Sequence, residues 1–175
     1  MNLKSKCLVA RPSIVDSHFK KSVVFVFDHT PHGTAGVVLN KRQNLNTQLL
    51  CHNKGFDTQV PSETVYIGGP VNTNSVCMLH TSDWRSSNTI DVNDSICISS
   101  DDMMFHKYCN GDTAFHYKWF TGHSVWHPRQ IKMEMNSNHW LVTELNTEQI
   151  FETDSRHIWD LAVETAAQEM MDKFI

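Results

Sequence analysis

The chain has 175 residues and a formal net charge of −4, a length that suits one domain with a sizeable core. Apolar residues make up 40% of it, which excludes the composition typical of intrinsic disorder. The acidic balance and the absence of clustered Lys and Arg disfavour direct binding to nucleic acid. No apolar run approaches the roughly 18 residues that cross a bilayer, and no signal-peptide core is found, so we expect a cytoplasmic protein with no membrane partner.

The first half of the sequence predicts three strands and a short helix. Residues 7–10 and 23–27 are apolar runs typical of strands, and the second is apolar on both faces, so it should lie inside the sheet. A helical turn or two is expected up to Phe19. Turn residues at 30–33 lead into a strand over 36–39, and three leucines at 45, 49 and 50 have the spacing of a short amphipathic helix.

The second half predicts alternating strands and helices. Strands are expected over 65–67 and 76–80, then a hairpin of 89–92 with 95–98. A helix should start at Ser100 to Asp102 and stop at Asn110–Gly111, because a hydroxyl and two carboxylates suit a helix N-terminus. A strand over 114–121 should place Phe115, Tyr117 and Trp119 on one face, and Pro128 suits the first turn of a helix to about residue 136. A last strand is expected over 140–142.

The C-terminal segment has the clearest helical pattern, with Ser155 or Asp154 as its cap. Its apolar residues recur at helical spacing, which predicts one buried face: Trp159, Ala162, Val163, Ala166, Met170 and Phe174. Strands outnumber helices and their order is irregular, which favours an α+β fold with a curved, mixed or partly closed sheet. No repeat or linker divides the chain, so a single domain over residues 1–175 is predicted.

The sequence contains no complete catalytic, metal or cofactor motif. The five cysteines are an odd number without a C-x-x-C pair, so reduced structural thiols are expected. His123 and His127 have the i, i+4 spacing of a metal-binding helix, but Gly122 and Pro128 flank them and no further ligand follows. Neither a metal nor a cofactor is therefore predicted.

Nucleophilic catalysis also lacks a motif. There is no G-x-S-x-G elbow. Cys77 and His80 are three residues apart on a predicted strand, which puts them on opposite faces. Asp101 and Asp102 are expected as first-turn helix residues in any case. We therefore expect a protein that is not an enzyme.

An ordered series of short motifs resembles the AlgH/YqgE family of bacterial proteins. In the first half the series comprises Val9–Ala10, Pro12, Phe19, Ser22–Val24, His29, Gly33, Gly36, Asn40–Lys41, Ile67–Val71 and Leu79–Thr81. The second half agrees at Gly122–Trp126, Gln130–Ile131, Glu134, Asn138, Trp140–Leu141, Ile150–Phe151 and Trp159. His123, Val125 and Arg42 depart from the residues usual in that family, which has Tyr, Gly and Pro there.

The resemblance implies a fold more clearly than a function. It implies one α+β domain with a bifurcated sheet, part of it closed into a small barrel and surrounded by helices. Members of the family are largely uncharacterised and often labelled as transcriptional regulators. The resemblance supplies no catalytic residues.

Two functions from different classes follow from these observations. The preferred one is a non-enzymatic cytoplasmic protein that acts through an unknown protein partner, with any effect on transcription being indirect. The alternative is a small-molecule or anion-binding protein, either non-catalytic or an enzyme, whose ligand-binding residues lie in loops at strand ends. These residues are His29, Asn40, Gly68, Gly69 and His80. Direct DNA binding is a third and weaker hypothesis.

Overall fold

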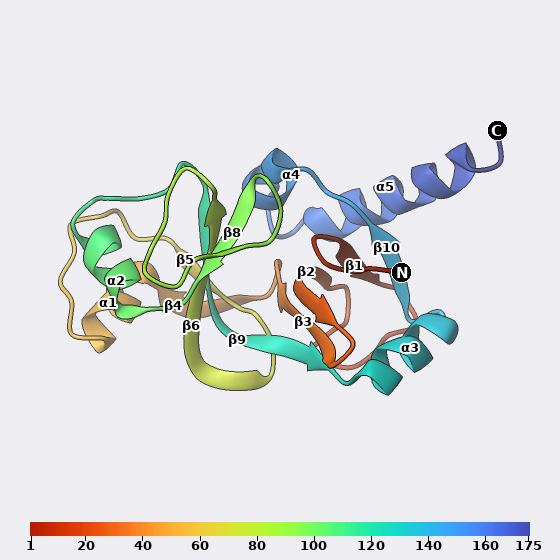
Figure 1. The fold of residues 1–175 in the computed structure, drawn as a ribbon, viewed down its shortest axis with the longest axis horizontal. Helices are drawn as coiled ribbons and strands as arrows, with labels where there is room; N and C mark the ends of the chain where they lie inside the picture. The colour runs from red at the N-terminus through yellow and green to blue at the C-terminus, as the bar shows by residue number, and fades with distance from the viewer.

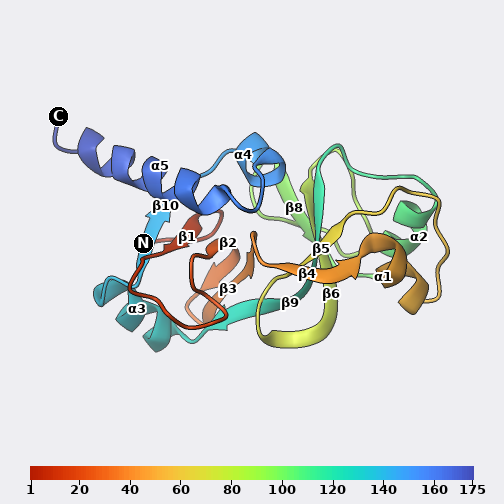
Figure 2. The same ribbon diagram turned by 180° about the vertical axis from the view of Figure 1, so that it is seen from behind.

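The computed structural model describes all residues, 1–175, as ten strands and five helices (Figure 1). In chain order these are β1 (Cys7–Ala10), β2 (Val23–Thr30), β3 (Gly33–Val38), β4 (Arg42–Asn46), α1 (Thr47–Asn53), β5 (Thr64–Ile67), β6 (Val71–Thr81), β7 (Ile90–Asp91), β8 (Ile96–Ser99), α2 (Asp102–Cys109), β9 (Tyr117–Trp126), α3 (Pro128–Asn136), β10 (Trp140–Thr143), α4 (Thr147–Glu152) and α5 (Ile158–Asp172). Helices α1 and α2 lie at one end of the molecule, and α3 and α5 at the other (Figures 1 and 2).

The sheet divides at β9. Residues 117–121 of β9 pair with β6 in the antiparallel sense. Residues 119–121 also pair with β5, on the other side of β9 and in the parallel sense. Residues 124–126 pair with β3. One branch continues from β5 to β4, and the other runs from β3 through β2 and β1 to β10. Beyond β6 the sheet extends to β8 and β7. The sheet is thus bifurcated and curls into a half-barrel, and the predicted α+β fold is confirmed.

The first four residues of strand β2 are buried on both faces of the sheet, as their continuous apolar sequence predicts. Val23 and Phe25 belong to one hydrophobic core, while Val24 and Val26 belong to a second on the opposite face. All four side chains are fully buried. A third core fills the other half of the molecule around Trp119 on β9. Burial of these side chains is the main stabilising contribution of the sheet.

The structure departs from the predicted elements at β9. This strand begins at Tyr117 and does not stop at Thr121 but continues through Gly122 to Trp126. Gly122 has a φ of +66°, a left-handed conformation that suits glycine and changes the direction of the strand between its two sets of partners. Phe115 precedes the strand and is 80% exposed, so its predicted place on the face of Tyr117 and Trp119 was wrong.

Two further predictions need correction. Residues up to Phe19 form turns and no helix. Helix α5 has His157 at its N-cap without a side-chain cap bond, in place of the predicted Ser155 or Asp154. Its apolar face is buried at Ile158, Ala162 and Ala166, but the last turns extend beyond the sheet (Figure 1).

Two short elements were not predicted, namely β4 and α4, and Leu45, which was assigned to the helix of Leu49 and Leu50, lies on β4. Asn146 and Gln149 form a capping box at the start of α4. None of the five helices is both long and apolar enough to span a membrane.

Candidate functional site

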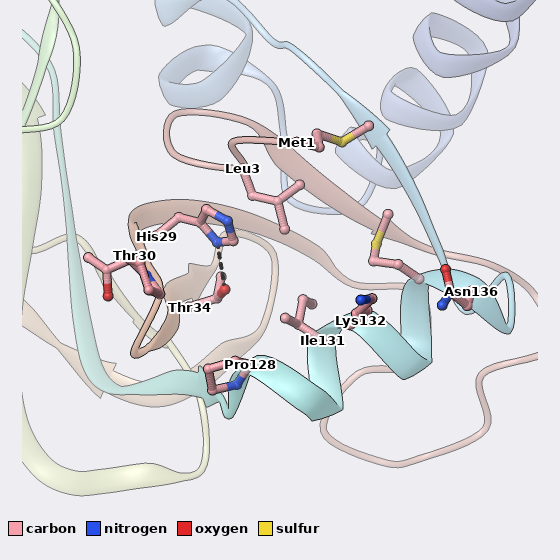
Figure 3. Close-up of a pocket in the computed structure, with 11 residues that line it drawn as sticks. Met1, Leu3, His29, Thr30, Thr34, Pro128, Ile131, Lys132 and Asn136 are labelled. Carbon is pink, nitrogen blue, oxygen red and sulfur yellow. Dashed lines mark hydrogen bonds between the residues drawn. The ribbon is translucent and has the colours of Figure 1, made fainter.

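A cavity of about 580 Å³ lies between the β2–β3 turn and helix α3 (Figure 3). Its walls come from three separate parts of the chain: the N-terminal segment, the turn and the helix. In Figure 3, His29 and Thr34 face the cavity from the hairpin, while Ile131, Lys132 and Asn136 line it from the helix. Its volume falls within the range of small-molecule sites, roughly 300 to 1,000 Å³.

His29 is fixed by the hairpin on which it lies. It pairs with Thr34 across the β2–β3 ladder, and its Nδ1 lies 2.8 Å from the Thr34 hydroxyl oxygen. Thr34 is buried, so its hydroxyl holds the imidazole in place. The other ring nitrogen, Nε2, has no hydrogen-bond partner within the protein. His29 can therefore offer one free polar atom to a molecule in the cavity.

Two residues at the N-terminus of helix α3 fix the point at which the helix begins. Pro128 is the first helical residue, where a missing N–H costs nothing, as the sequence predicts. The His127 side chain caps the helix by accepting a hydrogen bond from the Arg129 amide at 3.3 Å. Ile131 is buried against the core and reaches the cavity together with Leu3. These two side chains supply an apolar surface beside the polar hairpin.

The side chains that line the cavity carry a positive charge, whereas the chain as a whole is acidic. Lys132 is the only side chain with a permanent charge among the lining residues, and no Asp or Glu contributes. The whole chain carries 19 acidic against 15 basic residues. A partly apolar cavity with a cationic rim favours an amphipathic molecule with an anionic group.

Asn40 has a structural role at the opposite end of the same hairpin. Its Oδ1 accepts a hydrogen bond from the Val23 amide at 3.1 Å, and its Nδ2 donates to the Lys21 carbonyl at 2.9 Å. Since β2 separates Val23 from His29 by six residues, Asn40 lies about 20 Å along the strand from His29. The two residues do not share a site.

Gly68 and Gly69 lie where β5 and β6 meet β9. The Gly68 N–H donates to the Thr121 carbonyl at 2.8 Å, and its own carbonyl accepts from the Val38 amide and the Ser124 hydroxyl. A Cβ at Gly69 would overlap the backbone of His123. Both glycines therefore permit close approach of the strands. The backbone N–H and carbonyl of Gly68 are already hydrogen-bonded within the sheet.

His80 is fully buried in the other half of the sheet. Its Nδ1 lies 2.9 Å from the Thr81 carbonyl oxygen and its Nε2 lies 2.7 Å from the Ser99 hydroxyl, which in turn lies 2.7 Å from the Thr89 hydroxyl. Burial lowers the pKa of His80 below its usual value, so the ring is neutral near pH 7. Although Ser99 beside a neutral histidine has the makings of a nucleophile and base, His80 is fully buried and the Ser99 hydroxyl is already paired with both His80 and Thr89.

The five residues predicted to bind a ligand thus do not converge. Only His29 lines the cavity beside α3, and ligand binding at each of the five stays a prediction. Sequence analysis missed Thr34 and Lys132 as members of a site. The single signal for Lys132 was its place on the predicted helix of residues 128–136, which gives no indication that the hairpin lies opposite.

The structure contains no group of three or more His, Cys, Asp or Glu side chains that could hold a metal ion. His123 lies on β9 and His127 caps α3, so they do not share a helix face. All five cysteines are free. Cys77 and His80 point to different cores, as the predicted strand requires, and burial raises the pKa of the Cys77 thiol to about 12.

Comparison with known proteins identifies the family. The sequence model of the AlgH-like family, DUF179, matches residues 7–171. The chain belongs to the AlgH-like family. A UPF0301 protein of Parabacteroides distasonis is 31% identical over 165 residues, covering 93% of this chain and 82% of the relative. A UPF0301 protein of Marinomonas sp. strain MWYL1 is 29% identical over 157 residues, covering 88% and 84%. The resemblance read from the sequence is confirmed.

Two solved structures share the AlgH-like fold. The solution structure of the AlgH protein from Pseudomonas aeruginosa matches with a TM-score of 0.81 at 22% identity, covering 94% of this chain and 89% of that one. The crystal structure of DIP2367 from Corynebacterium diphtheriae matches with a TM-score of 0.72 at 21% identity, covering 92% and 86%. At such identities the likeness establishes the fold of this AlgH-like chain and leaves its function open.

Proposed function

We propose that this chain is a non-catalytic binding protein whose ligand is a small amphipathic molecule with a carboxylate or another anionic group. The proposed site is the cavity between the β2–β3 turn and α3. One observation carries the proposal: in a chain with a net charge of −4, this cavity is lined by Lys132 and by no acidic side chain. A charged group of the ligand would lie beside the Lys132 ammonium.

The other lining residues suit the remainder of such a ligand. Leu3, Ile131 and Met135 offer apolar surface to a short hydrocarbon segment. The free Nε2 of His29 and the amide of Asn136 add polar contacts at the edge. Binding is favoured over catalysis because the hydroxyl that pairs with the His29 ring, that of Thr34, belongs to a side chain that is buried.

Octanoate and octanamide are suitable probes, because they share a hydrocarbon chain and differ in charge. Isothermal titration calorimetry should detect octanoate binding, with octanamide weaker by about fivefold or more. Lys132→Met should weaken octanoate binding by about five- to tenfold and leave octanamide unchanged. Arg129→Met is the matched control, since it removes the same charge from an exposed position of α3 outside the cavity.

The outcomes separate the parts of the proposal. Equal binding of octanoate and octanamide would refute the anionic preference. Equal effects of Lys132→Met and Arg129→Met would mean that general charge, and not this cavity, attracts the ligand. Absence of octanoate binding at millimolar concentration, with no thermal stabilisation by other medium-chain carboxylates, would overturn the proposed function.

The expectation of a protein partner belongs to the same proposal. A ligand-binding protein without a cluster of basic residues would influence transcription indirectly, through another protein. Cytoplasmic location is part of this proposal and is supported by the free cysteines. Affinity capture from native extract, with and without octanoate, tests the idea. Recovery of a partner to the same extent with and without octanoate would show that partner binding does not depend on the cavity.

A further inference from the structure

A second cavity, of about 350 Å³, lies where the two halves of the sheet meet. Phe27 of β2 and His123 of β9 line it from one half, and Cys77 of β6 and Ile98 of β8 from the other. Its residues are separate from those of the cavity beside α3. Any ligand here is therefore independent of the proposed anionic ligand.

The lining of this second cavity carries no permanent charge. It contains no Asp, Glu, Lys or Arg. Burial lowers the pKa of His123 below its usual value, so the imidazole is neutral near pH 7 and has one donor and one acceptor. Burial also raises the pKa of the Cys77 thiol to about 12, which keeps it protonated. An ionised ligand group would find no counter-charge here, so the chemistry selects an uncharged molecule.

Two polar side chains of the lining are free to bind a ligand. Asn72 and His123 make no side-chain hydrogen bond within the protein, whereas the Asn88 amide is occupied by both backbone groups of Ser100. Asn72 has a φ of +49° and lies at an irregularity of β6 between residues 71 and 76. Irregularities of this kind redirect side chains out of the regular ladder. The free groups comprise an amide and an imidazole, each with a donor and an acceptor.

Apolar and aromatic surface accompanies these groups. The rings of Phe27 and His123 have centroids 6.5 Å apart at an interplanar angle of 60°. Ile90, on the short edge strand β7, is 60% exposed at the rim of the cavity. A flat ring can cover such surface at little entropic cost, because it has no internal rotations to lose.

We propose that this cavity binds an uncharged heterocycle whose edge carries both a hydrogen-bond donor and an acceptor, as the base of a free nucleoside does. Asn72 and His123 recognise the edge of the ring, while Phe27 and Ile90 contact its faces. The small volume admits a nucleoside, and the absence of cationic residues disfavours its phosphorylated forms.

The four common ribonucleosides and their 5′-monophosphates are the probes. In titrations followed by backbone amide NMR, at least one nucleoside should bind with submillimolar to millimolar affinity and shift the resonances of residues 72 and 123. Its monophosphate should bind more weakly. Asn72→Gly should weaken nucleoside binding about five- to tenfold, because glycine accepts the same backbone conformation and removes the amide.

Asn138→Gly is the matched control, because Asn138 also has a left-handed backbone, with a φ of +55°, and lies outside the cavity. His123→Phe keeps a ring and removes both nitrogens, and should weaken binding to a similar extent as Asn72→Gly. The proposal is overturned if no nucleoside binds, if the shifts map to the α3 cavity, or if Asn72→Gly and Asn138→Gly bind equally well. Tighter binding of the monophosphate would overturn the assignment of an uncharged ligand.

Discussion

Trp126 and Trp140 donate their indole N–H groups to the same carboxylate oxygen, Oε2 of Glu134, at 3.1 and 2.7 Å. The two rings pack edge to face, with centroids 5.9 Å apart. Trp126 ends β9 and Trp140 begins β10, so one side chain of α3 joins two strands. The same helix forms one wall of the cavity that we propose as the ligand site, and Glu134 therefore fixes that wall.

Replacing Glu134 with alanine should lower the free energy of unfolding by about 2 to 4 kcal/mol, because two charge-assisted hydrogen bonds are lost and two indole donors remain partly buried. Glu134→Gln keeps one carbonyl acceptor and should lose about half as much. Urea denaturation at pH 7 measures both values. Glu164→Ala, at an exposed site on α5, should change stability by less than about 0.5 kcal/mol. Equal losses in the two alanine variants would contradict the assigned role.

Gly69→Ala should be strongly destabilising, because the added methyl group would overlap the backbone of His123 and the hydroxyl of Ser124. We expect a loss of about 3 kcal/mol or more, read from urea denaturation or, if little folded protein forms, from the soluble fraction. Gly55→Ala is the comparison, since Gly55 also has an unusual φ, +87°, but has nothing within 4 Å of an added Cβ. It should cost only about 1 kcal/mol. Similar losses would mean that backbone strain, and not close strand approach, requires glycine at position 69.

Local sequence patterns predicted most elements because each carries its own signal. Continuous apolar residues marked β2 as a central strand, and Pro128 marked the start of α3. Strand β4 was missed since its sequence, Arg42–Asn46, has a single strongly apolar residue. The extension of β9 was missed because Gly122 resembles a strand terminator, whereas in the fold it marks a change of partner strands.

The candidate site was less predictable than the fold. His29 was named from its position at a strand end, but Thr34, Lys132 and Leu3 join it only through tertiary packing. No local pattern places the N-terminal segment around Leu3 and the helix that begins at Pro128 against the same hairpin. His80 was named for the same reason as His29, yet a chain of hydroxyl partners and Trp84 enclose it. Burial of this kind follows from the whole sheet and not from neighbouring residues.

Truncating apolar side chains at the two ends of the α5 pattern should have different effects on stability. Phe174, at the end of the pattern, is 89% exposed, while Ile158, at the start of the helix, is fully buried. Phe174→Ala should therefore change the free energy of unfolding by less than about 0.5 kcal/mol, and Ile158→Ala should lower it by about 2 to 4 kcal/mol. Thermal and urea denaturation of the two variants measure this contrast. A loss above 1 kcal/mol for Phe174→Ala would mean that the end of the helix packs against the protein.

Lys118 should lower the free energy of unfolding at neutral pH, and this destabilisation should become smaller as the pH rises. Its ammonium is buried without a hydrogen-bond partner, 5.1 Å from the centre of the Tyr66 ring, and burial lowers the pKa of the side chain from 10.5 to about 8. Between pH 8 and 10.5 the unfolded chain binds more protons than the folded one, so this group's contribution to stability rises with pH. Lys118→Met should therefore be more stable than the wild type by about 1 to 3 kcal/mol at pH 7. This gain in the free energy of unfolding should shrink towards pH 10.5, as measured by urea denaturation of both proteins at each pH. Lys20→Met, at an exposed position, is the control. A gain that is independent of pH would show that the charge of Lys118 is not its cause.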